Sequence, residues 1–144
     1  MGSEPTEFYP DGTKFWIVDG QLHREDGPAV IRMNGTQEWW LNGKLHREDG
    51  PAYISPLGTQ IWYKHDKFHR EDGPALIREN GETEWYFENK RHRLDGPAIT
   101  TYWYIHDNDV TIEITKWAKE RDIDLNNLTE EDKMAIKFEW GQRI

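Results

Sequence analysis

Short apolar stretches alternate with polar turns along the first three quarters of the chain. One kind of stretch is built around a tryptophan, and these tryptophans recur every 23 residues: Trp16, Trp39, Trp62 and Trp85. A second kind, such as Val30-Ile31 or Leu76-Ile77, lies between successive tryptophans. Both are too short for an amphipathic helix and are rich in β-branched and aromatic residues, so the pattern predicts short β-strands.

Turn signals separate these stretches. Asn34-Gly35 and Asn80-Gly81 precede a tryptophan stretch, and Asn42-Gly43 follows one. Asn-Gly between apolar runs is the strongest short hairpin signal, and it implies positive φ at both turn positions. The third copy loosens this pattern, because Pro56-Leu57-Gly58 and His65-Asp66 stand where the other copies carry their turn residues. We expect each unit to be two short antiparallel strands and a structured loop.

The loop is the most regular part of the repeat. His-Arg-Glu-Asp-Gly-Pro-Ala starts at His23, His46 and His69, and a fourth copy at 92–98 differs only at Leu94. A fixed period of this size is typical of stacked supersecondary units. We therefore predict a mainly β fold, a single extended antiparallel meander of tandem 23-residue β-hairpin repeats over residues 1–114. A motif that recurs in this way is more typical of scaffold than of an active site, so function is expected where the copies differ.

The chain changes character near its C-terminus. Residues 102–105, a polar turn and residues 110–114 suggest a closing hairpin in which Asn108 stands at the next expected tryptophan position. Residues 115–144 are predicted to form a small α-helical cap that covers the last strand, because open sheet edges invite pairing with other chains.

Two helices are expected within this cap. The first would begin at Thr115, and the second at Thr129 with a capping box that uses Asp132. Met134 and Phe138 lie four residues apart in the second helix, the spacing of side chains that contact each other on one face.

Composition narrows the classes of function. The chain of 144 residues is 13% aromatic with eight tryptophans but only 35% hydrophobic, which favours a thin sheet in one structural domain. It has no cysteine, which excludes disulfides and thiolate metal sites. No apolar run approaches the roughly 20 residues of a membrane helix and no leader is visible, so we expect no membrane contact and a cytoplasmic location. The net charge of −9 argues against general nucleic-acid binding.

The repeat resembles known families over roughly residues 11–114. Its glycine, aromatic pair and Asn-Gly turn resemble a divergent MORN-type repeat and are similar to the repeats of YwqK-family antitoxin-like proteins. The fuller His-Arg-Glu-Asp-Gly-Pro-Ala string, joined to an ending like 128–133, resembles small proteins of tailed phages. The resemblance implies consecutive hairpins and a binding role, and it supplies no catalytic residues.

Metal and catalytic chemistry are not expected. Equivalent histidines of neighbouring repeats should lie about 9–10 Å apart along the sheet, whereas two nitrogens on one zinc lie within about 4 Å of each other. The recurring aspartates Asp26, Asp49, Asp72 and Asp95 could approach the spacing of an inverting glycosidase, but turn geometry explains an aspartate before Gly-Pro. No phosphate loop or nucleophile elbow is present. The sequence therefore predicts no enzyme activity, no metal and no cofactor.

Two basic clusters distinguish copies three and four. They lie beside aromatic pairs, and Leu94 removes the glutamate that balances the neighbouring arginine in the other copies. The candidate ligand-binding residues are Trp62, Tyr63, Lys67, His69, Arg70, Trp85, Tyr86, Lys90, Arg91, His92 and Arg93. Aromatic rings can stack on a base while arginine holds phosphate. The same residues also fit an aromatic core stripe with ordinary solvated cations.

These residues lead to two functional hypotheses. The first is a non-enzymatic binding protein, a phage-type counter-defence factor that sequesters a small anionic nucleotide-like ligand. The alternative is a protein–protein interaction module that inhibits a host protein, since tryptophan, tyrosine and arginine dominate binding hot spots. One aromatic face could instead be covered by a second copy, which would make the protein a homo-oligomer.

Overall fold

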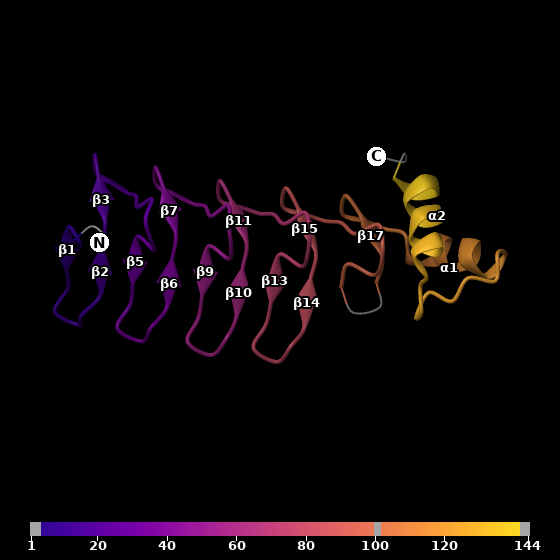
Figure 1. Cartoon of the computed structure of the whole chain (residues 1–144), viewed down its shortest axis with the longest axis horizontal. Helices are drawn as coiled ribbons and strands as arrows, with labels where there is room; N and C mark the ends of the chain where they lie inside the picture. The colour runs from indigo at the N-terminus through magenta and orange to yellow at the C-terminus, as the bar shows by residue number, and fades with distance from the viewer. Residues whose placement is uncertain (1–3, 100–101, 142–144) are drawn as a thin grey trace.

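The structure of the protein is a computed structural model that describes residues 4–99 and 102–141. Within these residues the fold is mainly β, with short strands arranged in hairpins and two helices at the C-terminal end. Figure 1 shows the hairpin units side by side in a row, with the helices beyond the last unit. The predicted meander of hairpin repeats with a helical cap is confirmed.

One row of strands forms a continuous eight-stranded antiparallel sheet, in which every strand pairs with its neighbours in chain order. Its strands are β1 (Glu7–Phe8), β2 (Lys14–Phe15), β5 (Val30–Ile31), β6 (Gln37–Glu38), β9 (Tyr53–Ile54), β10 (Gln60–Ile61), β13 (Leu76–Ile77) and β14 (Thr83–Glu84). Two strands of this sheet come from each repeat, so successive repeats add to it by translation.

Each repeat also carries a second, separate hairpin, which we call the tip hairpin. The tip hairpins are β3 (Ile17–Val18) with β4 (Gln21–Leu22), β7 (Trp40–Leu41) with β8 (Lys44–Leu45), β11 (Tyr63–Lys64) with β12 (Lys67–Phe68), β15 (Tyr86–Phe87) with β16 (Lys90–Arg91), and β17 (Tyr104–Ile105) with β18 (Asn108–Asp109). The repeat tryptophan stands between the strand of the main sheet and the strand of the tip hairpin. The Trp39 N–H donates to the Ala52 carbonyl, and the Trp39 carbonyl accepts from the His46 N–H. The predicted tryptophan strand is therefore two short strands, one on each side of the tryptophan, and a repeat has four strands where two were expected.

The two turns of a repeat differ in geometry. In the turn of the main sheet only the glycine has positive φ, as at Gly35 (90°), while the Asn34 side chain accepts a hydrogen bond from the Thr36 N–H. The expectation of positive φ at both positions is wrong here, and Gly58 (100°) keeps the same turn in the third copy. The tip hairpins do use two residues of positive φ, including His65 (50°) with Asp66 (65°), the geometry that matches strand twist.

The fifth unit is shorter than the others. Trp103, not Asn108, occupies the tryptophan position, since its carbonyl accepts from the Val110 N–H just as Trp85 accepts from His92. The structure places no strand at 110–114, because α1 (Thr111–Lys119) already begins there. The expected helix start at Thr115 is therefore wrong: the Asp109 side chain accepts from the Thr111 N–H and the Thr111 hydroxyl accepts from the Trp103 N–H.

The second helix begins as predicted. In α2 (Glu130–Trp140), Thr129 and Asp132 form both hydrogen bonds of the capping box. Its buried side chains are Ile136 and Trp140, whereas Met134 and Phe138 are 70% and 75% exposed. The spacing of Met134 and Phe138 places them on one face, but that face is turned to solvent.

The hydrophobic core lies at the junction of the last repeat and the cap. Among the described residues it consists of Trp103, Ile105, Ile114, Ile136 and Trp140. Within the repeats the buried apolar residues are the loop alanines, such as Ala52, and single larger side chains, Trp16, Val30 and Leu76. Hydrogen bonds join neighbouring tip hairpins, as from the Asp66 N–H to the Leu45 carbonyl. Neither described helix is long and apolar enough to cross a membrane.

Candidate binding grooves

Each repeat loop is organised by an arginine whose guanidinium lies over the tryptophan ring of its own repeat. The guanidinium carbon is 4.0–4.1 Å from the ring centroid in the pairs Arg24–Trp16, Arg47–Trp39, Arg70–Trp62 and Arg93–Trp85. A cation over an aromatic face is attracted by the ring quadrupole. The recurrence of this contact in four repeats makes it part of the scaffold.

The rest of the loop holds this arginine in place. The Arg70 Nε donates to Asp72 at 2.9 Å and Nη1 donates to the Pro74 carbonyl at 3.2 Å, and both contacts recur in the other loops. The hydrogen bond and charge of Arg70 lower the pKa of Asp72. A Cβ on Gly73 would lie 2.6 Å from the Arg70 Cζ, so a larger residue there would displace the guanidinium. Arginine, aspartate, glycine and proline of the motif thus share one structural task.

The histidine connects its loop to the next repeat. The His46 Nδ1 accepts the His65 N–H at 3.2 Å, which leaves Nε2–H to donate to Glu48 at 2.9 Å. The two imidazole rings of His46 and His65 lie 4.3 Å apart. The Nδ1 contact recurs at His23 and His69, so the histidine is structural in the first three loops. The glutamate of these loops forms no ion pair with a lysine or an arginine of the described residues, unlike the aspartate.

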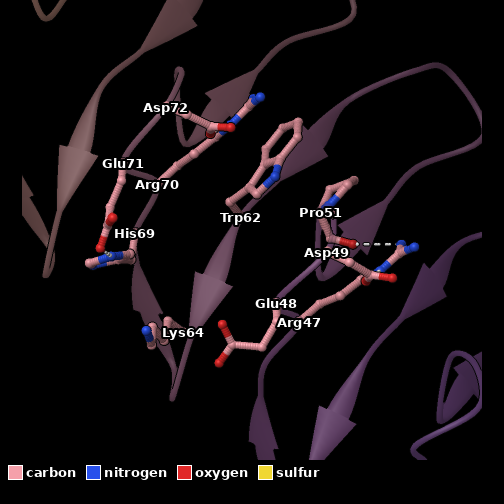
Figure 2. A pocket seen from close by; sticks show the side chains of 11 residues that line it. Arg47, Glu48, Asp49, Pro51, Trp62, Lys64, His69, Arg70, Glu71 and Asp72 are labelled. Atoms are coloured by element: carbon pink, nitrogen blue, oxygen red, sulfur yellow. Dashed lines mark hydrogen bonds and ion pairs between the residues drawn. The ribbon is translucent and has the colours of Figure 1, made fainter.

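A groove lies between each pair of consecutive loops, and the tryptophan of the later repeat lines it. The first groove, of about 700 Å³, lies between loops 23–29 and 46–52 and contains Trp39. The second, of about 690 Å³, lies between loops 46–52 and 69–75 and contains Trp62. In Figure 2 Trp62 lies between Arg70 and Pro51, the two sides of the second groove.

The third groove differs because the cap reaches it. It has about 330 Å³ and is lined by Trp85, Phe87, Arg93 and Leu94 together with Lys137 of α2. Its volume is at the lower limit for a small-molecule site.

The charge of the grooves changes along the row. The first groove has two arginines against four carboxylates, so two negative charges are in excess. The second has three cations, including Lys64, against four carboxylates. The third has three cations, Arg70, Arg93 and Lys137, against the two carboxylates of Glu71 and Asp95. The net charge of the groove lining therefore changes from negative in the first groove to slightly positive in the third.

The candidate residues predicted from the sequence fall into two groups in the structure. Six of them line grooves: Trp62, His69 and Arg70 in the second, and Arg70, Trp85, His92 and Arg93 in the third. The others belong to the tip hairpins and line none of these grooves. Their rings and cations contact other residues of the tip hairpins: the Tyr63 and Phe68 rings lie 4.8 Å apart, and Arg91 lies over Tyr104. Lys67 pairs with Glu88 at 2.9 Å, and Lys90 is exposed.

Arg70 and Arg93, the two candidate arginines that line grooves, are already engaged by their own loops. Arg93 lies on Trp85 and donates to Asp95 at 2.8 Å. Burial raises the pKa of Asp95, but the hydrogen bond and charge of Arg93 outweigh it, so the net shift is downward. Burial, followed by the charge of His106, lowers the pKa of His92. The cationic character of this region is therefore smaller than the sequence suggests.

Leu94 has a packing role. It contacts the core at the cap, where the corresponding glutamate of the other loops is exposed. Leucine stands in place of glutamate at this position because α1 and α2 supply the apolar side chains against which it packs.

Sequence reasoning missed the whole first groove with Trp39, and among the charged groove residues it missed Glu25, Glu48, Glu71 and Lys137. The three glutamates have side chains that are 70–86% exposed and line the first and second grooves. Because these glutamates recur in the motif, sequence reasoning assigns them to the scaffold. Within the motif, however, arginine pairs with aspartate and leaves the charge of the glutamate unbalanced. Nothing in the sequence places Lys137 beside loop 92–98.

No protein-family model, curated protein or solved structure matches the chain. Within the part of the chain that the structure describes, no three side chains of histidine, aspartate or glutamate converge as a metal site would require.

Proposed function

We propose that the protein is a non-enzymatic protein–protein interaction module that holds an extended segment of a partner along the first and second grooves. The observation that carries this proposal is the repetition of one groove, with an equivalent tryptophan, two arginines and four carboxylates, at successive repeat boundaries. A compact ligand needs one site, whereas a chain-like ligand gains affinity from each equivalent site that it reaches. Inhibition of the partner would follow from occupying that segment.

The composition of the grooves supports this class of ligand. Each contains a tryptophan beside exposed carboxylates, such as Trp62 with Glu48 and Glu71. Tryptophan is enriched in binding hot spots, and charged groups at a rim guide recognition.

A selection from a random 12-residue peptide library, followed by binding measurements, tests the proposal. We expect the selected peptides to bind the wild type and to lose at least about tenfold in affinity with the double variant Glu48→Trp, Glu71→Trp, because the new side chains fill the second groove without burying a charge. The matched control is Glu79→Trp, Glu120→Trp, at exposed positions away from the grooves. Selected peptides that bind both variants equally well would refute a role for the grooves.

A second candidate function rests on the third groove. The excess cation contributed by Lys137, beside Trp85, would suit a small anionic, nucleotide-like ligand. A thermal-shift panel of linear and cyclic nucleotides checks this idea. It predicts a rise in melting temperature that is lost in Lys137→Glu and kept in Lys116→Glu, an exposed lysine of α1 outside the grooves. An unchanged melting temperature across the panel would exclude it.

A further inference from the structure

We infer that the partner segment is a polyproline II helix with a basic side chain at every third residue. This inference rests on the proposed function and specifies its ligand. It combines the spacing of the grooves with their charge.

The spacing of the grooves follows from the sheet. Each repeat contributes two strands to the main sheet, so equivalent points of neighbouring repeats lie about 9.6 Å apart at the usual strand separation. A polyproline II helix rises about 3.1 Å per residue with three residues per turn, so every third side chain points the same way at intervals of about 9.3 Å. One side chain in three can therefore enter successive grooves.

Other backbone conformations fit this spacing less well. In a β-strand, side chains on one face are separated by about 6.6 Å or multiples of it, which does not match the groove interval. In an α-helix, residues seven apart are separated by about 10.5 Å, which exceeds the groove interval by about 0.9 Å, whereas the polyproline II spacing differs from it by about 0.3 Å. Polyproline II segments also bind aromatic-lined grooves in other recognition domains, and Trp39 and Trp62 line these grooves.

The charged residues of the repeat loops determine which partner side chain fits in a groove. Arg47 is neutralised by Asp49, whose pKa it lowers, and Arg70 is neutralised by Asp72 in the same way. The glutamates Glu25, Glu48 and Glu71 remain as exposed carboxylates in the first and second grooves. Lysine or arginine complements these grooves, while the third groove, with its excess cation, disfavours a further basic residue.

Synthetic peptides of equal composition test the spacing. (Arg-Pro-Pro)4 places arginine at every third residue, and (Arg-Arg-Pro-Pro-Pro-Pro)2 contains the same residues at different spacing. We expect the first peptide to bind the wild-type protein at least about tenfold more tightly by isothermal titration calorimetry at low ionic strength. A helical alanine-based peptide with arginine at every seventh residue should bind more weakly than (Arg-Pro-Pro)4.

Matched variants test the charge. Glu25→Gln, Glu48→Gln, Glu71→Gln should weaken the binding of (Arg-Pro-Pro)4 by about tenfold, as expected for the loss of several exposed ion pairs. The control Glu7→Gln, Glu79→Gln, Glu120→Gln removes as many charges from exposed positions outside the grooves and should change affinity by less than about twofold.

The outcomes separate the two proposals. Equal affinity for the two proline-rich peptides, tighter binding of the helical peptide, or equal losses in both variants would overturn the polyproline inference. Library peptides that are blocked by the groove-filling variant would still support the interaction module in that case.

Discussion

Replacing Trp103 with alanine is expected to lower the free energy of unfolding by about 3–5 kcal/mol, the range for removing a buried aromatic side chain. Trp103 is 3% exposed and contributes to the core that joins the last repeat to α1 and α2. Its removal leaves a cavity between Ile105, Ile114 and Ile136, and the two helices should lose their attachment to the sheet. Urea denaturation followed by helical circular dichroism measures the effect.

The control for this experiment is the neighbouring residue. Tyr102 is 52% exposed and lies outside the core, so Tyr102→Ala should cost less than about 1 kcal/mol. Similar losses in the two variants would mean that the cap is not anchored through the fifth tryptophan.

Replacing Leu94 with glutamate should also destabilise the protein, although it restores the sequence of the other loops. The variant removes apolar contact with the cap core and places a carboxylate against it. We expect a loss of about 2–3 kcal/mol from the sum of these effects, measured by urea denaturation.

The reverse substitution in the third loop is the matched control. Glu71 has a 75% exposed side chain, so Glu71→Leu should change stability by less than about 0.5 kcal/mol. If Leu94→Glu were as neutral as Glu71→Leu, packing against the cap would not explain the departure of the fourth loop.

The sequence predicts the repeat architecture well because its signals are local. The short strands, the positions of the turns and the capping box at Thr129 follow from short stretches of sequence, and the structure confirms them, although only the tip hairpins have positive φ at both turn positions. The fifth unit does not align with the others because the sequence from Ala98 to Trp103 is five residues shorter than that from Ala75 to Trp85, which breaks the 23-residue period. The start of α1 was missed because Asp109 and Thr111 together end the hairpin and begin the helix.

The site could be predicted only in part. Trp62 and Trp85 lie beside basic residues, as the sequence predicts. The two residues of an aromatic pair do not act together, because Trp62 lines the second groove while Tyr63 packs against Phe68 in the tip hairpin. The ion pair of Arg70 with Asp72 and the position of Lys137 in the third groove are set by the folded structure and could not be predicted from the sequence. Counting charges along the chain therefore overestimates the basic character of copies three and four.

The most direct test of binding along the repeat grooves is a titration of ¹⁵N-labelled protein with (Arg-Pro-Pro)4, followed through the tryptophan indole signals by nuclear magnetic resonance. We expect the signals of Trp39 and Trp62, which line the first and second grooves, to shift together with one dissociation constant. Those of Trp40 and Trp117, which line none of the described grooves, should stay in place. Shifts at Trp40 or Trp117 with Trp39 and Trp62 unchanged would contradict binding in the grooves.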